Sequence, residues 1–356
     1  MLHKADLWHQ EGKRVRCELC SHRCGIASGV CGICGVRKNE DGVLYSLNYG
    51  KLVAAGADPV EKKPLFHFQP GSKSFSIATA GCNFKCLHCQ NSRISQLPRG
   101  GIRLGSINHG IDNYEGQRIP GDITDAEEVV SRAVAEGCKS IAYTYTEPTI
   151  FFEYARDCAE LASREGLKNI FVTNGYMTAE CLGAMKDDAG KLWLDAANVD
   201  IKSFSEDFYS RVCSARLAPV LETIERMLEA GVWVEVTTLV IPGYNDSEEE
   251  LRELARWIKK TNPNMPWHIS AFFPTYKLTD VPPTPAATID RAREIGLGEG
   301  LRYVYTGNLC GDSGESTYCY ECKELIIKRR GFEVLENLIK GGKCPFCKAE
   351  IDGVDL

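Results

Sequence analysis

Strand-like and helix-like stretches alternate through residues 74–306, and this alternation restricts the folds open to the chain more than any other property of the sequence. The strand candidates are SFSIATA, KSIAYTYT, KNIFVTN, ANVDIK, VWVEVTTLV, WHISAFF and LRYVYTG. The stretches between them are amphipathic; in one, Thr124 and Glu127 have the spacing of a capping box and Gly137 predicts the helix end. This order predicts an α/β fold in which parallel strands form a barrel or a partial barrel, with its site at the carboxyl ends of the strands.

Length and composition predict one large domain with small appendages. The chain has 356 residues, 44% of them hydrophobic, which is enough for a domain of roughly 200–250 residues. We expect a Cys-rich metal-binding segment at 1–50, the α/β domain at 51–306 and a second Cys-rich unit at 307–356. Residues 97–122 are rich in Gly, Pro and Asn, which indicates either a mobile cover over the site or disorder.

Three cysteines follow the first strand candidate directly. Cys82, Cys86 and Cys89 lie within CNFKCLHC, in the spacing C-x3-C-x2-C. Three thiolates on one loop can bind three irons of a cubic iron–sulfur cluster and leave the fourth iron open, and an open coordination position indicates chemistry. The alternatives are a zinc site, for which His88 offers a fourth ligand, or an incidental group of thiols.

This loop resembles that of the radical S-adenosylmethionine (SAM) enzymes, in which it binds a [4Fe–4S] cluster and SAM chelates the free iron. Nearly the whole chain resembles the AmmeMemoRadiSam-system radical SAM proteins, relatives of the pyruvate formate-lyase activating enzymes. The segments that carry this likeness are RCELCSHRC, EKKPLFHF, AYTYTEPT, PWHIS and the terminal pair of C-x2-C motifs. The resemblance implies a partial (β/α)6 TIM-like radical SAM barrel with a zinc-ribbon-like tail.

The resemblance also implies a reaction. An electron donor such as flavodoxin or ferredoxin reduces the cluster, SAM is cleaved to a 5′-deoxyadenosyl radical, and the radical takes a hydrogen atom from a substrate. A protein or peptide partner is the first expectation, as in an activase. The alternatives are a small-molecule metabolite, or a metal-handling or electron-transfer protein without SAM turnover.

Residues after the second and third strand candidates are expected to contact SAM. AYTYTEPT resembles the Gly-Gly-Glu-Pro stretch of the family, with Tyr145 and Thr146 in place of the glycines. The resemblance assigns Glu147 to the SAM amino group; alternatively, this carboxylate only begins a helix at Pro148. Asn174, in FVTNGY, is either a ligand contact or part of a turn.

The later strand candidates supply further expected contacts. Asp200 and Lys202 alternate along VDIKS and so share one face, where an inward charge pair is costly unless it is satisfied or functional. The pair resembles the Asp-x-Lys of the activases, which contacts the SAM ribose and carboxylate; a structural ion pair is the alternative. By the same likeness Ile241 lies near the adenine and His88 over SAM. His268 is either a substrate or carboxylate contact or a core histidine.

The last cysteines form two C-x2-C pairs, Cys319 with Cys322 and Cys344 with Cys347. Two such pairs at this spacing are typical of a zinc ribbon, in which four thiolates close a tetrahedron around a structural ion. The alternative is a rubredoxin-like iron.

The first cysteines form a less regular group. Cys17, Cys20 and Cys24 have the spacing C-x2-C-x3-C, and Cys34 or Cys31 offers a fourth thiolate. Such a site binds either zinc or an auxiliary [4Fe–4S] cluster, and His22 is a further candidate ligand. We expect the isolated cysteines 138, 158, 181, 213 and 310 to be core residues.

The charge and the absence of apolar runs point to a soluble protein. The net charge is −6 without long runs of one sign, so we expect no nucleic-acid partner. The first residues contain no apolar export segment, and no stretch is long enough to span a bilayer. We therefore expect a cytoplasmic protein with no membrane partner, in which the 17 cysteines serve metal rather than disulfides.

Overall fold

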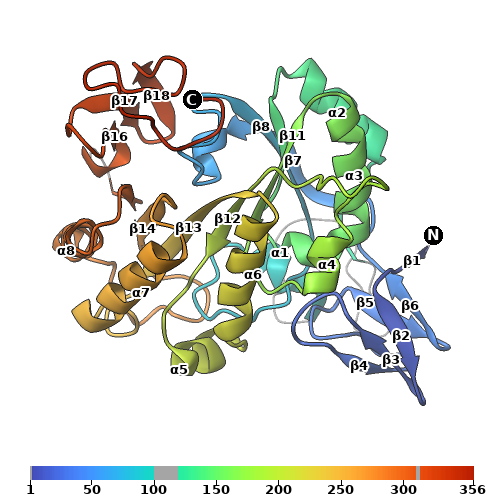
Figure 1. Ribbon diagram of the computed structural model, residues 1–356. Helices are drawn as coiled ribbons and strands as arrows, with labels where there is room; N and C mark the ends of the chain where they lie inside the picture. Colours follow the sequence, from blue (N-terminus) through green and yellow to red (C-terminus); the bar gives the residue numbers. More distant parts are fainter. Residues whose placement is uncertain (1, 100–118, 310–312) are drawn as a thin grey trace. The chain divides into compact units, whose positions relative to one another are not determined.

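The computed structural model describes residues 2–99, 119–309 and 313–356 (Figure 1). The chain divides into two compact units. The first combines Met1–Ala57 with Ser74–Asp195, and the second combines Asp58–Lys73 with Ala196–Leu356. The predicted domain boundaries at 50 and 306 stay a prediction. The expected cover at 97–122 lies mostly outside the described residues, as does Cys310.

The first unit begins with two small antiparallel sheets, of strand order β1-β6-β5 and β2-β3-β4 (Figure 1). Their cores are small, with Val15, Val36 and Leu44 each fully buried. The strands are β1 (His3–Lys4), β2 (Trp8–Glu11), β3 (Arg14–Cys17), β4 (Gly25–Ala27), β5 (Arg37–Glu40) and β6 (Val43–Ser46).

The same unit contains the strand series β9-β7-β8-β10-β11. β8 pairs with β10 and β10 with β11, both in parallel, and helices connect the successive parallel strands. All but the first residue of β8 are buried, as expected for a parallel strand covered on both faces. The strands are β7 (Lys51–Pro59), β8 (Lys73–Thr79), β9 (Asp122–Ile123), β10 (Ser140–Tyr143) and β11 (Lys168–Thr173). The helices are α1 (Ser92–Ser95), η2 (Leu97–Arg99), α2 (Ala126–Ala135), η3 (Pro148–Phe151), α3 (Phe152–Arg164) and α4 (Ala179–Gly183).

In the second unit β12, β13, β14 and β15 are parallel and follow one another in chain order. A last antiparallel sheet, β16-β17-β18, carries the C-terminal cysteines. The strands are β12 (Ala196–Asp200), β13 (Trp233–Val240), β14 (Trp267–Ala271), β15 (Val304–Gly307), β16 (Thr317–Tyr318), β17 (Leu325–Arg330) and β18 (Glu333–Asn337). The helices are η1 (Val60–Lys62), α5 (Glu206–Phe208), η4 (Tyr209–Cys213), α6 (Ala218–Glu229), α7 (Glu248–Thr261), α8 (Ala286–Gly298) and η5 (Ser313–Glu315).

The predicted α/β class is confirmed, since each of the seven strand candidates contains a strand and helices connect them. One local prediction is wrong. The residue that caps α2 is Asp125, without a side-chain capping bond, whereas the Thr124 hydroxyl donates to the Asp122 carbonyl at 3.4 Å instead. Gly137 does end this helix, with φ of 68°. Within the described part of the chain, no helix is both long and apolar enough to cross a membrane.

Candidate functional site

The predicted cluster loop follows β8 and is surrounded by groups that can donate hydrogen bonds to sulfur. The Phe84 N–H donates to Cys82 Sγ at 3.4 Å, and the Asn174 amide lies 3.9 Å from the same sulfur. Cys89 Sγ lies 3.1 Å from the Ser95 hydroxyl. Cys86 is buried. The loop therefore presents three thiols, and hydrogen-bonding groups lie close to two of their sulfurs.

The three thiols also affect one another electrostatically. Burial raises the pKa of the Cys82 thiol well above its ordinary value, and Glu147, Cys86 and Cys89 raise it further. Without a cation the group therefore favours its protonated state, and bound metal is what would hold three thiolates together. This chemistry fits a cluster with one iron left free of protein ligands.

Glu147 is the centre of the hydrogen bonds beside this loop, with only 1% of its surface exposed. One carboxylate oxygen accepts from the Thr149 N–H at 3.1 Å, the Thr149 hydroxyl at 2.5 Å and the Thr173 hydroxyl at 2.7 Å. The other accepts from the Asn174 N–H at 2.8 Å. Burial raises the pKa of Glu147, although these donors oppose the rise. Glu147 thus caps η3, as the alternative reading proposed, and also fixes the turn after β11.

Through that turn the structure brings three predicted residues together. The Asn174 side chain, held next to Glu147, donates to Asn83 Oδ1 at 2.7 Å, and Asn83 follows Cys82 in the chain. Cys82, Glu147 and Asn174 therefore form one hydrogen-bonded group. That Glu147 and Asn174 bind SAM stays a prediction.

Tyr145 replaces a glycine of the family stretch, and its backbone keeps the conformation that glycine favours. Its φ is 64°, in the left-handed region that bulky residues rarely adopt. The Tyr145 carbonyl accepts from the Asn91 amide at 2.7 Å. This chain thus has a tyrosine at a position whose positive φ a glycine would adopt without strain.

The second unit places Asp200 at the carboxyl end of β12, paired with Lys202. Lys202 Nζ lies 2.9 Å from Asp200 Oδ2, and their side chains are 17% and 36% exposed. The Lys202 N–H donates to the Tyr209 hydroxyl at 3.1 Å. The expected proximity of the two charges is confirmed, and their contact with the SAM ribose and carboxylate stays a prediction.

Asn245 is a structural residue of this region that the sequence analysis missed. Its amide donates to the Lys202 carbonyl at 2.7 Å and to the Leu239 carbonyl at 2.9 Å, and its oxygen accepts from the Ile241 N–H at 2.6 Å. Asn245 therefore ties Lys202 to Ile241, a predicted adenine contact that is fully buried. The only signal in the sequence is a polar residue in the turn PGYND.

His268 lies second in β14, near the amino end of the strand, with its ring engaged by a carboxylate. Its Nε2 is 2.6 Å from Glu235, which also accepts from the main-chain N–H groups of Phe66 and His67. Burial opposes ionisation of Glu235, but the two histidines hold its pKa below the ordinary value. These contacts match the alternative reading of His268 as a core residue, and its role toward SAM stays a prediction. The predicted position of His88 over SAM also stays a prediction; its side chain is buried, with 4% of the residue exposed.

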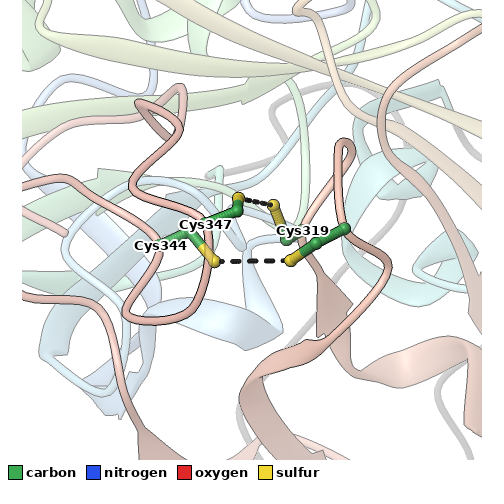
Figure 2. Close-up of side chains that lie close together, drawn as sticks. Cys319, Cys344 and Cys347 are labelled. Carbon is green, nitrogen blue, oxygen red and sulfur yellow. Dashed lines mark hydrogen bonds between the residues drawn. The ribbon is translucent and has the colours of Figure 1, made fainter.

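The four C-terminal cysteines point toward one another (Figure 2). Cys319 Sγ lies 3.6 Å from Cys347 Sγ, and Cys322 Sγ lies 3.7 Å from Cys344 Sγ. Zinc–thiolate bonds of about 2.3 Å place the sulfurs of a tetrahedron about 3.8 Å apart. The arrangement therefore fits one tetrahedral ion; that this ion is zinc stays a prediction.

The N-terminal cysteines line a small cavity in the first unit. Cys17, Cys20, Cys24 and Cys34 all contribute to its wall, together with His22 and Arg37. Cys31 is not part of this wall, and the charged groups that act on its thiol are Lys38 and Glu40. Cys34 thus lies beside the other three cysteines of the group, and that these four bind a metal stays a prediction.

Comparison with known proteins identifies the family. The family model of the Radical SAM superfamily matches residues 76–258, just over half of the chain, including the cluster loop. An uncharacterised protein of Methanocaldococcus jannaschii is 41% identical over 345 residues, which cover 96% of each chain.

Two more distant relatives carry functional names. A GTP 3′,8-cyclase of Actinobacillus succinogenes is 23% identical over 293 residues, 77% of each chain. A second M. jannaschii protein, named provisionally as a glycyl-radical enzyme activating enzyme, is 24% identical over 237 residues, 64% of this chain and 78% of that protein. With the family match, the three-cysteine loop and the α/β fold in agreement, this chain belongs to the Radical SAM superfamily.

Proposed function

We propose that this chain is an activase-like radical SAM enzyme, which takes a hydrogen atom from a protein or peptide partner. Cys82, Cys86 and Cys89 would hold a [4Fe–4S] cluster. When bound and reduced, the cluster and SAM together supply a 5′-deoxyadenosyl radical. The observation that carries the proposal is the three-thiol loop after β8, inside the segment that matches the family.

The neighbouring residues have distinct tasks in this proposal. Glu147 fixes the turn after β11, so that Asn174 stays beside Cys82. Asp200 and Lys202 bind the SAM ribose and carboxylate, and Ile241 packs near the adenine. The electron comes from a small redox protein such as flavodoxin or ferredoxin.

The choice of a protein partner is supported by one relative. The second M. jannaschii protein is named for activating an enzyme, so the molecule that its name implies as substrate is itself a protein. The GTP 3′,8-cyclase supports a second candidate, because the substrate in its name is a nucleotide and it covers more of this chain. A small-molecule substrate is therefore the competing function.

The first experiment tests the reaction class. Anaerobically reconstituted protein is reduced with dithionite, mixed with SAM and assayed for 5′-deoxyadenosine. We expect product from the wild type and from Cys138→Ala, which changes a buried cysteine outside the cluster loop. Cys86→Ala should form none. Equal yields from Cys86→Ala and the wild type would contradict the assignment.

The second experiment separates the two substrate classes. Cells that express the enzyme are grown on deuterated medium, and their extract is divided into a protein fraction and a small-molecule fraction. Each fraction is added to unlabelled enzyme with SAM and dithionite, and 5′-deoxyadenosine is analysed by mass spectrometry. Deuterium transfer from the protein fraction alone supports the activase-like function, whereas transfer from the small molecules alone supports the competing one.

A further inference from the structure

The cavity lined by the N-terminal cysteines has no role in the function proposed above. Three of its four cysteines are almost completely buried, with exposures of 5% for Cys17, 9% for Cys20 and 7% for Cys34. Cys24 is partly buried. The wall between them is apolar, with Leu19, Ile26 and Ile33 among its residues. Four free thiols thus converge on a space that is closed to most of the solvent.

Main-chain N–H groups donate to three of these sulfurs. The donors are His22 to Cys20, Ile33 to Cys24 and Val36 to Cys34. In two of the three pairs the donor follows the cysteine by two residues. Such donors stabilise sulfur anions, and the hydrogen bonds to sulfur also set the properties of a metal–thiolate centre. Burial raises the pKa of Cys20, Cys24 and Cys34, and these donors oppose the rise, so thiolates in this cavity would need a bound cation.

Arg37 supplies a positive charge to the same wall. Its side chain is 1% exposed, and its guanidinium is held by Glu153 at 2.7 Å and by the Asp6 carbonyl at 2.5 Å. Its Nε has no acceptor within the described residues. A buried donor without an acceptor is costly. A thiolate or an inorganic sulfide in the cavity would provide the missing acceptor and match the charge.

The distances between the cysteine sulfurs distinguish a site for a single metal ion from a site for a four-iron cluster. The sulfur atoms of the four C-terminal cysteines all lie within 4.8 Å of one another. Within residues 2–99, 119–309 and 313–356, the N-terminal cysteines do not form a group this tight. Thiolates around one zinc ion meet that limit. Thiolates around a four-iron cube are farther apart, because the cube occupies the centre. The spacing of the N-terminal thiols is therefore wider than one tetrahedral ion requires, and it leaves room for the larger group.

This cavity also lies next to the loop of Cys82. His22 is two residues from both Cys20 and Cys24, and its Nε2 lies 3.0 Å from the Asn83 carbonyl oxygen. The segment before it is fixed, because the Ser21 N–H donates to the Tyr176 carbonyl at 2.9 Å. One side chain and one hydrogen bond thus connect the N-terminal site to the residue that follows Cys82.

We propose that Cys17, Cys20, Cys24 and Cys34 bind a second [4Fe–4S] cluster, which relays electrons to the site on Cys82, Cys86 and Cys89. One electron enters from a low-potential reduced flavin or iron–sulfur protein, which is oxidised by one electron. This electron reduces the second cluster. The second cluster returns to its oxidised state when the electron passes, by way of His22 and Asn83, to the cluster on Cys82, Cys86 and Cys89, which is reduced by one electron. The relay rests on the proposed SAM cleavage, whereas the presence of the cluster does not.

Metal analysis tests the cluster separately from the reaction. The full chain with Cys82, Cys86 and Cys89 all changed to Ala should retain about four iron atoms after anaerobic reconstitution, and the wild type about eight. Adding Cys34→Ser to the triple variant should remove that iron, whereas adding Cys31→Ser should not. Four irons in the wild type, or zinc in place of iron in the triple variant, would overturn the second cluster.

A comparison of two electron sources tests the relay. His22→Phe should keep the iron content of the wild type, and SAM cleavage driven by reduced flavodoxin should fall severalfold more than cleavage driven by dithionite, a small reductant. An equal change with both reductants, or no change, would overturn the relay. If the wild type contains about eight irons but does not cleave SAM, the proposed function is contradicted, whereas the second cluster is still supported.

Discussion

Tyr145 has a backbone conformation that a tyrosine ordinarily avoids. An L-residue in the left-handed region costs about 1–2 kcal/mol relative to its usual conformations, whereas glycine adopts this region freely. The φ of 64° therefore places local strain beside Glu147. Such strain persists where surrounding contacts hold the conformation, and here the Tyr145 carbonyl is engaged by Asn91.

We expect Tyr145→Gly to be more stable than Tyr145→Ala by about 1 kcal/mol. Both changes remove the phenol ring, and only glycine also removes the Cβ atom that causes the strain. Urea unfolding of the two variants, followed under identical reconstitution conditions, measures the difference. Coincident unfolding curves would show that this position carries no strain.

Asp200 is predicted to contribute to binding more than to stability. Its pair with Lys202 is partly exposed, so the pair contributes little to folding, about 0–1 kcal/mol. A lost hydrogen bond to a charged ligand group costs about 1.5–3 kcal/mol. Asp200→Ala should therefore weaken SAM binding about ten-fold or more and leave the iron content unchanged.

A SAM titration of the reconstituted variant measures this effect. The matched control is Asp207→Ala, which removes an exposed carboxylate that pairs with Arg211. Unchanged SAM affinity in Asp200→Ala, together with a lowered unfolding temperature, would favour the structural ion pair.

The sequence indicates three groups of cysteines as candidate metal ligands, but it does not indicate the residues that pack and hydrogen-bond around them. Cysteine ligands are recognisable because the chemistry demands one residue type at short spacing. Asn245, Arg37 and Glu235 act through tertiary hydrogen bonds, and a polar residue in a loop or strand gives no sign of its distant partners. The sequence singled out Glu147 as a SAM contact, which stays a prediction, and it gave no sign of the four donors, which come from two different segments of the chain.

At the scale of elements, the positions of the parallel strands were predictable from the sequence. The stability of the C-terminal tail depends on bound metal as well as on its strands. The β16-β17-β18 sheet encloses a very small core, made by Cys319, Ile326, Ile327, Ile339, Cys344 and Ile351. Two of these six residues are expected metal ligands. A unit with so little apolar area gains much of its folding free energy from bound metal.

Cys344→Ser, or removal of the ion by a chelator, should therefore make residues 319–356 sensitive to protease. SAM cleavage should persist, because four thiolates leave no position open for a substrate. Limited proteolysis with mass spectrometry of the fragments, alongside metal analysis of the full chain, measures both. A tail that resists protease without metal would contradict this prediction, and iron in place of zinc would correct the identity of the ion.

At the scale of the whole molecule, His67 connects parts of the second unit that are far apart in sequence. Its Nε2 lies 2.5 Å from the Tyr305 hydroxyl and its Nδ1 lies 2.6 Å from the Asp352 carbonyl. Burial lowers the pKa of His67 to about 4, and although Glu235 opposes the change, Arg329 and His268 add to it. Between about pH 4 and pH 6.5, the folded protein therefore keeps this ring neutral, whereas the same ring in the unfolded chain binds a proton.

Stability should consequently fall as the pH drops from about 6.5 toward 4, by about 3 kcal/mol for this group. The stabilising contribution of the neutral His67 ring is fully present above the pKa of this group in the unfolded chain. It is lost as the pH falls toward the pKa of the group in the folded protein. His67→Gln cannot take up this proton, so the stability advantage of the wild type over the variant should shrink over that range. Denaturant unfolding at several pH values measures the difference, and a constant difference would contradict the assignment.

The division into two units could not be read from the sequence. Hydrophobic periodicity reports local structure, and it placed all the parallel strands in the order found. It carries no information on which distant segments pack together, so the union of residues 58–73 with the C-terminal half was not predicted. The expected ends of the barrel followed the cysteine groups instead, because those are the visible breaks in the pattern.

This union has a consequence for biosynthesis. The Gln69 N–H donates to the Val354 carbonyl, the Val354 N–H donates to the His67 carbonyl, and His67 and Asp352 are 285 residues apart. At about 5–20 residues per second, a ribosome needs roughly 15–60 s to make the partners that this segment requires. During that interval Phe66 and Phe68, both buried in the finished fold, emerge without them. The nascent chain therefore exposes an apolar segment that chaperones can bind until translation is nearly complete.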